Sequence, residues 1–224
     1  MNLKEVVGKE AVNYMKDGMI VGLGTGSTVF YFVHALAEKV KEGLNIEMVS
    51  TSIQTVELAK SLGLSIKDLE EIDHIDLAVD GVDEIDKDFN AIKGGGAALF
   101  REKIVADIAR EVIWIYDESK DVEKLGNFNL PVEILPFGYS HTIRKMEEAG
   151  LKPVLRLKDG ATLITDNNNY IVDLHLGYGF DIKSVKEKLE SIVGVVEHGL
   201  FLNMCKLCIK GTEQGAVIIE NPNN

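Results

Sequence analysis

The chain has 224 residues, and its 46% hydrophobic and 27% charged content is ordinary for a folded globular protein. That length suits one large domain or two smaller ones and is sufficient to bury a hydrophobic core. The formal net charge is -12, so a nucleic acid or an anionic membrane surface would be repelled, and neither is expected as a partner.

The first 18 residues mix charged and apolar side chains at helical spacing, which is typical of neither a signal peptide nor a transit peptide. No apolar run approaches the roughly 18 residues that a membrane-spanning helix needs. We therefore expect a cytoplasmic protein.

Apolar runs alternate with segments of helical period in the first half, the pattern of a parallel sheet with crossover helices. The expected strands are residues 19–23, 46–50, 75–79 and 112–116, and the expected helices are 28–40, 54–62 and 97–110. This half is predicted to be Rossmann-like.

The composition changes after Lys120, where residues 126–129 lead into Pro131 and Pro136, a pattern that favours a crossing between domains. Beyond it we expect helices at 141–149 and 182–192, and strands at 154–157, 162–164, 170–174 and near 195. Two last strands, 206–211 and 216–220, return to the first sheet. The prediction is an α/β fold, with a Rossmann-like domain of residues 1–128 and 203–224 and a smaller α+β domain of residues 129–202.

A glycine-rich loop at residues 22–28, GLGTGST, lies between the first strand and the first crossover helix. Backbone N–H groups and hydroxyls at a helix N-terminus suit a phosphate. The predicted phosphate-binding residues are Thr25, Gly26, Ser27 and Thr28. A glycine turn with a helix-capping hydroxyl and no ligand is the alternative that these residues alone leave open.

A dinucleotide is a poorer fit to the same loop. Its third glycine is misplaced for G-x-G-x-x-G, and the second strand ends in Ser50-Thr51-Ser52 where a ribose-binding acid should stand.

A second group of reactive side chains lies between residues 80 and 103. It consists of Asp80 and Asp83, then Lys93 ahead of the glycines at 94–96, then Glu102. A carboxylate can abstract a proton next to a carbonyl, while a lysine and bare backbone N–H groups hold the resulting oxyanion. With the phosphate loop, this predicts proton transfer on a phosphorylated carbonyl compound. Taken alone, however, Glu102 would be expected to face solvent.

Two patterns could indicate a calcium loop, or a redox pair or half of a metal site, and the sequence favours neither. From Asp86, the acidic run fits a calcium loop at Asp88 and Asn90, but Ala91 replaces the turn glycine and Ala97 replaces the bidentate glutamate. Cys205 and Cys208 form a C-x-x-C, yet the surrounding segment is predicted to be a strand, in which residues three apart point to opposite faces. We expect two reduced thiols and no metal.

Six segments carry a resemblance to a known family. They are GLGTGST at 22–28, STSIQT at 50–55, DLAVDGVDEID at 76–86, KGGGAALFREKIVA at 93–106, DESK at 117–120 and GVVEHGLF at 194–201. In order and spacing the chain resembles the ribose-5-phosphate isomerase A family. This implies interconversion of D-ribose 5-phosphate and D-ribulose 5-phosphate through an enediolate, in the non-oxidative pentose phosphate pathway, without metal or other cofactor.

The resemblance also implies roles for particular residues. Glu102 would be the base, Lys93 would stabilise negative charge, and Asp80 and Asp83 would assist ring opening and proton shuttling. The implied substrate contacts are Thr25, Gly26, Ser27, Thr28, Asp80, Gly81, Val82, Asp83, Lys93, Gly94, Gly95, Gly96 and Lys120, with Lys4 a weaker candidate. A homodimer or homotetramer is implied as well.

Two other functions remain open. One is another phosphosugar isomerase or deaminase of related fold. The other is a non-catalytic sugar-phosphate sensor, which normally carries a DNA-binding helix-turn-helix ahead of such a loop, whereas here only residues 1–21 precede it. The presence of both Lys93 and Glu102 favours chemistry over sensing.

Overall fold

The computed structural model describes residues 2–223 and divides into two compact units. The first unit comprises Met1–Val82, Arg101–Lys120 and Asn203–Asn224, and the second comprises Asp83–Phe100 and Asp121–Leu202. Residues 83–100 and 121–128, which the sequence analysis assigns to the Rossmann-like domain, belong to the second unit here.

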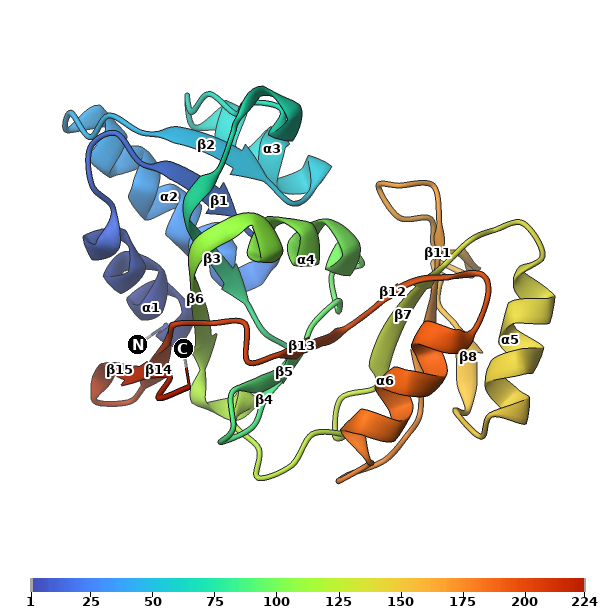
Figure 1. The fold of residues 1–224 in the computed structure, drawn as a ribbon. Helices are drawn as coiled ribbons and strands as arrows, with labels where there is room; N and C mark the ends of the chain where they lie inside the picture. The colour runs from blue at the N-terminus through green and yellow to red at the C-terminus, as the bar shows by residue number, and fades with distance from the viewer. Residues whose placement is uncertain (1, 224) are drawn as a thin grey trace. The chain divides into compact units, whose positions relative to one another are not determined.

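The first unit is built on a six-stranded sheet in the order β15-β14-β6-β3-β1-β2 (Figure 1). The strands are β1 (Ile20–Leu23), β2 (Glu47–Ser50), β3 (Ile75–Gly81), β6 (Ala109–Asp117), β14 (Leu207–Thr212) and β15 (Gly215–Glu220). Five of them are parallel, and only β15 runs antiparallel to its neighbour β14. The predicted Rossmann-like parallel sheet is therefore confirmed.

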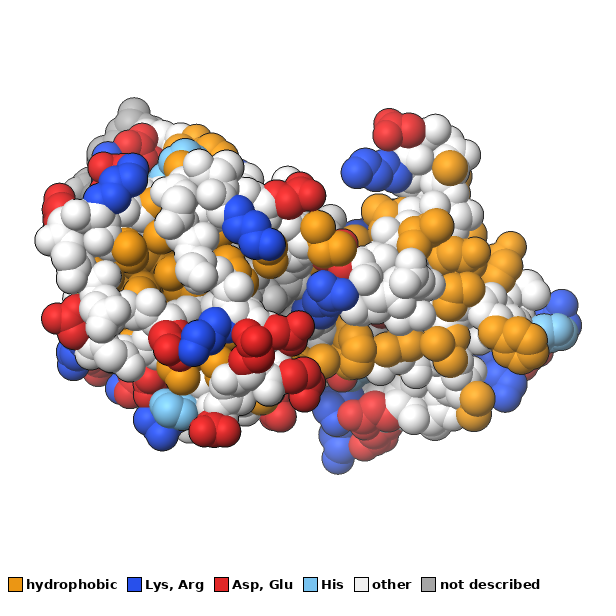
Figure 2. Space-filling view, turned by 90° about the horizontal axis from the view of Figure 1, so that it is seen from above, with side chains coloured by type: hydrophobic (Ala, Val, Ile, Leu, Met, Phe, Trp, Pro, Cys, Tyr) orange, Lys and Arg blue, Asp and Glu red, His pale blue; other side chains and the backbone are white. Residues whose placement is uncertain are grey.

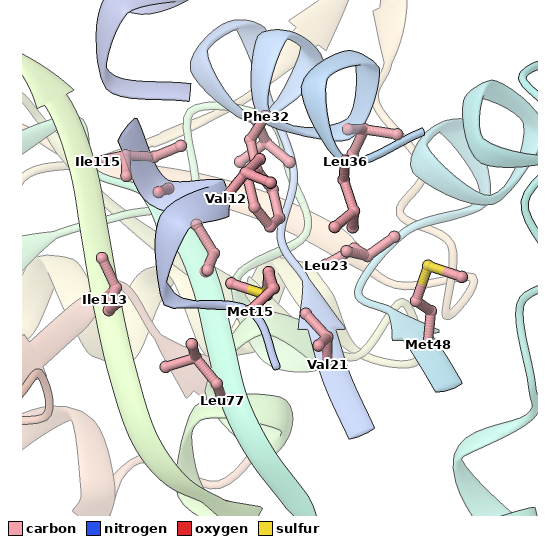
Figure 3. Close-up of a cluster of buried hydrophobic side chains, with 14 of the residues drawn as sticks. Val12, Met15, Val21, Leu23, Phe32, Leu36, Met48, Leu77, Ile113 and Ile115 are labelled. Carbon is pink, nitrogen blue, oxygen red and sulfur yellow. The ribbon is translucent and has the colours of Figure 1, made fainter. Parts of the chain in front are cut away.

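Helices cover both faces of this sheet. They are α1 (Leu3–Ala11), α2 (Ser27–Lys41), α3 (Ile53–Ser61) and α4 (Leu99–Ile108), with short 3₁₀ helices η1 (Val12–Tyr14), η2 (Leu69–Glu71) and η3 (Glu118–Lys120). The helices α1 and α2 pack on each other over one face. Alternate strand residues such as Val21, Leu23 and Ile115 meet Phe32 and Leu36 of α2 there, in a core with no solvent access (Figure 3).

The opposite face of the sheet is shaped by small residues beneath α4. A Cβ on Gly22 would lie only 2.7 Å from Cγ1 of Val105, so glycine is what lets the helix approach β1 so closely. This helix is shorter than predicted. It ends at Ile108, because Ala109 and Arg110 already belong to β6 and Ala109 pairs with Ile75 of β3.

The second unit holds a four-stranded antiparallel sheet in the order β12-β7-β11-β8. Its strands are β7 (Leu130–Ile134), β8 (Pro153–Leu155), β11 (Tyr170–Leu174) and β12 (Val195–His198), and its helices are α5 (Tyr139–Glu148) and α6 (Ile182–Ser191). One face contributes Val132, Ile134 and Val172 to a core that includes Met146 of α5 and Leu189 of α6. This is the smaller α+β unit that the sequence predicts.

Smaller strands complete the second unit, and several of them have no counterpart in the prediction. A three-stranded sheet joins β4 (Glu84–Ile85), β5 (Asn90–Ile92) and β13 (Leu200–Leu202), and a hairpin joins β9 (Leu157–Lys158) to β10 (Ala161–Thr162). The expected strand at 154–157 is in fact two strands, β8 and β9, separated at Arg156.

None of the described helices combines the length and apolar character needed to cross a membrane. On the face displayed in Figure 2, acidic and basic side chains are intermingled rather than gathered into one broad basic area.

Candidate functional site

The predicted phosphate loop joins the carboxyl end of β1 to the N-terminus of α2. Gly26 is the N-cap residue of this helix and has φ 109°, a conformation that L-residues with a side chain rarely adopt. Gly26 and Ser27 are exposed, whereas Thr25 is only 8% exposed. Exposed N–H groups at a helix N-terminus can receive an anion.

A buried network of hydroxyls holds this loop from below. Thr25 Oγ1 lies 2.7 Å from Thr51 Oγ1 and 2.8 Å from Ser52 Oγ, and Thr55 Oγ1 donates to the carbonyl of Gly24 at 2.9 Å. Ser52 is also the N-cap of α3. Thr51, Ser52 and Thr55, which follow β2, therefore support the loop, and the predicted ligand Thr25 uses its hydroxyl within the protein.

Lys4 brings a positive charge to the loop from α1. Its Nζ donates a hydrogen bond of 2.8 Å to Oγ of Ser27. From the sequence, Lys4 is only a weak candidate for a substrate contact, because a lone lysine on an amphipathic helix is most often a surface residue. The structure places its ammonium directly on an exposed residue of the phosphate loop.

Asp80 occupies the C-terminal part of β3, which extends to Gly81 rather than ending at residue 79. Its carboxylate is buried, and Oδ1 accepts hydrogen bonds from the amides of Thr25 (3.1 Å) and Gly81 (2.7 Å). A Cβ on Gly24 would collide with this carboxylate at 2.1 Å. Gly24 thus makes room for Asp80 beside the phosphate loop.

Glu102 lies in the first turn of α4 and is only 4% exposed. The expectation that this side chain, considered alone, faces solvent is therefore wrong. The helix turns Glu102 inward, although its sequence neighbours Arg101 and Lys103 are of the kind usually found at the surface.

Farther along the chain, Lys120 ends η3 just after the carboxyl end of β6. Ligands of open α/β sheets bind at the edge formed by such strand ends.

The remaining predicted residues belong to the second unit. Lys93 follows β5 and is 3% exposed, with its Nζ 5.2 Å from the centre of the Phe201 ring. Its backbone N–H donates to the carbonyl of Gly199 at 2.9 Å. A cation over an aromatic face keeps part of its electrostatic stabilisation when it is removed from water.

Val82 is buried where the chain passes from the first unit to the second.

Asp83 is bound to the glycine segment itself. Its Oδ2 accepts a hydrogen bond of 2.7 Å from the amide of Gly95, while its own N–H donates to Ile92 at 2.9 Å. Gly94 has φ 110° and is enclosed, because a Cβ there would lie 2.9 Å from Leu99. Gly95 and Gly96 are exposed. One of the amides predicted to bind an oxyanion, that of Gly95, is therefore hydrogen-bonded to the carboxylate of Asp83 in this structure.

Three comparisons with known proteins bear on this arrangement. A sequence model described as ribose 5-phosphate isomerase A (phosphoriboisomerase A) matches residues 47–215. The chain is 52% identical over 219 residues to a ribose-5-phosphate isomerase A of Limosilactobacillus reuteri, covering 97% of this chain and 96% of the relative. The chain belongs to the ribose 5-phosphate isomerase A family.

Solved structures of the same family agree with the fold over nearly the whole chain. One is the ribose 5-phosphate isomerase A of Methanocaldococcus jannaschii, with a TM-score of 0.91, 39% identity and 98% of each chain covered. Another is a D-ribose-5-phosphate isomerase in complex with phospho-erythronic acid, with a TM-score of 0.92 and 38% identity, covering 98% of this chain and 100% of that one.

The cysteine pair is arranged differently from the prediction. Cys205 precedes β14, which begins only at Leu207, so the alternation of a strand does not apply to it. Both cysteines are buried, and their sulfur atoms lie 3.7 Å apart rather than on opposite faces. Among residues 2–223, no cluster of three or more His, Cys, Asp or Glu side chains is arranged to hold a metal ion.

Proposed function

We propose that this protein interconverts D-ribose 5-phosphate and D-ribulose 5-phosphate by proton transfer through an enediolate. The observation that carries the proposal is the membership of the ribose 5-phosphate isomerase A family over nearly the full length of the chain. The reactive residues support it, since the chain holds a buried carboxylate, a buried lysine and a glycine-rich anion loop in that family's order.

The phosphate binds at the loop of the first unit. The N–H groups at the start of α2 point toward the anion, and the Lys4 ammonium, bound to Ser27, supplies a compensating charge. Lys120 is the second cation that we assign to the substrate. These local charges matter because the protein as a whole carries a net charge of -12 and repels anions at long range.

Glu102 is the general base. It removes the proton from C2 of the open-chain aldose, and the electron pair of that C–H bond forms the C1–C2 double bond while the carbonyl oxygen on C1 becomes negative. The same carboxyl group then returns the proton to C1, and the C2 oxygen becomes the ketone. Lys93 and the amides of Gly94, Gly95 and Gly96 stabilise the negative oxygen in between.

Asp80 and Asp83 act on the hydroxyl groups. They assist opening of the sugar ring and carry the proton that passes between the C1 and C2 oxygens. Asp83 accepts a hydrogen bond from Gly95 in this structure, so binding of an anionic oxygen at that amide requires the carboxylate to release it. Gly81 and Val82 complete the proposed substrate contacts.

The relative bound to phospho-erythronic acid supports the enediolate route. The carboxylate of that acid places two oxygens on one planar carbon, as an enediolate places oxygens on planar carbons, and its phosphate is retained. We further propose that the protein works in the cytoplasm, in the non-oxidative pentose phosphate pathway, as a homodimer or homotetramer that needs no metal or other cofactor.

A coupled assay with ribose 5-phosphate in the presence of excess chelator tests this function. We expect ribulose 5-phosphate to form at the same rate with and without chelator, and the reaction in D₂O to incorporate deuterium at C1 of the ketose. Absence of isomerisation would refute the proposed reaction. Activity that vanishes with the chelator and returns with added metal would refute the metal-free mechanism.

A further inference from the structure

Arg156 separates β8 from β9 in the second unit and is fixed by its backbone on both sides. Its N–H donates to the carbonyl of Ile171 at 2.8 Å, and its carbonyl accepts from the N–H of Leu163 at 3.0 Å. The side chain is only 14% exposed. Removing most of a charged side chain from water is costly, so the contacts that compensate for this cost in Arg156 need an explanation.

The guanidinium of Arg156 joins two features of the second unit. On one side, Nε and Nη2 form a two-pronged ion pair with Asp173 of β11, with Nε 2.8 Å from Oδ2. On the other side, Nη1 donates to the carbonyls of Gly94 at 2.8 Å and Gly95 at 3.2 Å. These carbonyls belong to the glycine segment that follows Lys93.

Holding those two carbonyls fixes two amides. In a trans peptide the C=O of one residue and the N–H of the next lie in one plane and point in opposite directions. Anchoring the carbonyls of Gly94 and Gly95 to Arg156 therefore turns the N–H groups of Gly95 and Gly96 away from it. The Gly95 amide shows this directly, because it points at Asp83 with a hydrogen bond of 2.7 Å.

We propose that Arg156 is a positioning residue that aims the amides of Gly95 and Gly96 at the negative oxygen of the reacting sugar, with Asp173 holding the guanidinium in place. This inference rests on the proposed isomerase function. Glycines give a segment little conformational preference of its own, so the three at 94–96 need an external contact to keep one orientation. Preorganised N–H donors cost no reorganisation when charge develops on the substrate.

The identity of the residue matters as well as its position. Arginine presents a planar fork, so one side chain can bind a carboxylate with two nitrogens and still direct a third toward the carbonyls. A lysine carries the same charge as a single point and cannot make both sets of contacts at once. A cation on the carbonyl side of a peptide also polarises it, which strengthens the N–H on the other side as a donor.

The first test compares Arg156→Lys and Asp173→Asn with the wild-type protein. Arg144→Lys, on the exposed side of α5 in the same unit, is the matched control. We expect kcat for ribose 5-phosphate to fall about 10- to 100-fold in Arg156→Lys and by a smaller factor in Asp173→Asn, less than the loss of a whole oxyanion donor. The KM and the inhibition constant of inorganic phosphate should stay within about threefold, because the phosphate loop is not touched.

Two further measurements separate positioning from a purely structural role. Phospho-erythronic acid should bind Arg156→Lys more weakly by about the factor lost in kcat/KM, as expected for an analogue of the intermediate. Added guanidinium ion should restore part of the kcat of Arg156→Ala and none of the kcat of Glu102→Gln. This second comparison remains informative if Arg156→Lys folds poorly.

The proposal is wrong if Arg156→Lys and Asp173→Asn keep wild-type kcat. It is also wrong if, in these two variants, kcat and the inhibition by phosphate both fall only in proportion to the fraction of the protein that is folded. Failure of the wild-type protein to isomerise ribose 5-phosphate would instead refute the proposed function, a result that the wild-type assay gives before any variant is made.

Discussion

The ammonium of Lys4 lies 2.8 Å from Oγ of Ser27, which joins the first turn of α1 to the phosphate loop at the start of α2. Neither residue is near the other in the sequence, and packing of α1 on α2 brings them together. The contact places a cation where an anion would meet the exposed N–H groups of the loop.

Replacing Lys4 by methionine should therefore weaken binding of the phosphate. A hydrogen bond to a charged group is worth about 1.5–3 kcal/mol, so we expect KM for ribose 5-phosphate to rise roughly 10- to 100-fold with a smaller change in kcat. Lys9→Met, which removes only a surface pair with Glu5, is the control. Steady-state kinetics decide the matter, and an unchanged KM in Lys4→Met would remove Lys4 from the binding site.

Gly26 offers a test in which backbone strain and phosphate binding can be separated. Gly26 has φ 109° and Gly43, which follows α2, has φ 114°, and a Cβ on either would meet no atom within 4 Å. Alanine at either position should cost about 1 kcal/mol of stability, since both conformations disfavour a side chain.

Only Gly26→Ala should also raise KM, by about tenfold or more, because Gly26 is the N-cap of the helix whose first N–H groups are proposed to bind the phosphate. Urea unfolding and steady-state kinetics on the pair give the two effects. Equal KM values for the two variants would mean that the loop does not bind the phosphate.

Glu102→Gln should separate chemistry from binding. Glutamine keeps the size of the side chain but cannot accept the C2 proton, so we expect kcat to fall about 10²- to 10⁴-fold with little change in KM. Exchange of the C2 hydrogen with solvent deuterium should fall in parallel. Glu38→Gln, on the exposed side of α2, is the control. Near-normal exchange in Glu102→Gln would transfer the role of base to Asp80 or Asp83.

The cysteine pair is expected to contribute to stability and not to turnover. Both side chains are buried with their sulfur atoms 3.7 Å apart. Cys205→Ser with Cys208→Ser places two hydroxyls in this interior and should lower the free energy of unfolding by about 1–3 kcal/mol for each group that lacks a good partner. Turnover of the folded double variant should stay within a few-fold, and a large loss with folding intact would contradict a structural role.

Asp76 should make stability depend on pH. Its Oδ2 accepts a hydrogen bond of 2.9 Å from the backbone N–H of Ile20, and this bond, together with the nearby His74 and Arg110, lowers the pKa of the carboxyl group. A lowered native pKa means that the stabilisation is complete above the unfolded value of about 4 and is lost as the pH falls through the native value.

Asp76→Asn should therefore be less stable than the wild type at pH 7, by about 1.5–3 kcal/mol for a hydrogen bond to a charged group, and the difference should shrink in acid. Urea unfolding between neutral pH and pH 3, with the exposed Asp88→Asn as control, measures it. A stability difference independent of pH would show that the charge of Asp76 is not responsible.

Most elements of the first unit follow from the sequence. The strands β1 and β2 and the helices α2 and α3 lie within a residue of their predicted bounds, because buried parallel strands and amphipathic helices leave distinct apolar periods. The short strands β4, β5 and β13 carry no such signal. They form because residues 84–85 pair with the nearby residues 90–92, and residues 90–92 pair in turn with residues 200–202, which are distant along the chain.

The sequence by itself determined the family, and it singled out the glycine-rich loop at residues 22–28 and the side chains of Asp80, Asp83, Lys93 and Glu102 as the candidate site, because local chemistry and motif spacing can be recognised along the chain. Only the tertiary structure decided what surrounds these groups. Segments distant in sequence bury Glu102 and bring Lys4 to Ser27. They also bring Arg156 within hydrogen-bonding distance of the carbonyl of Gly94. Such contacts leave no local pattern in the sequence. A lone lysine or arginine is expected to be a surface residue until the tertiary structure shows which groups lie beside it.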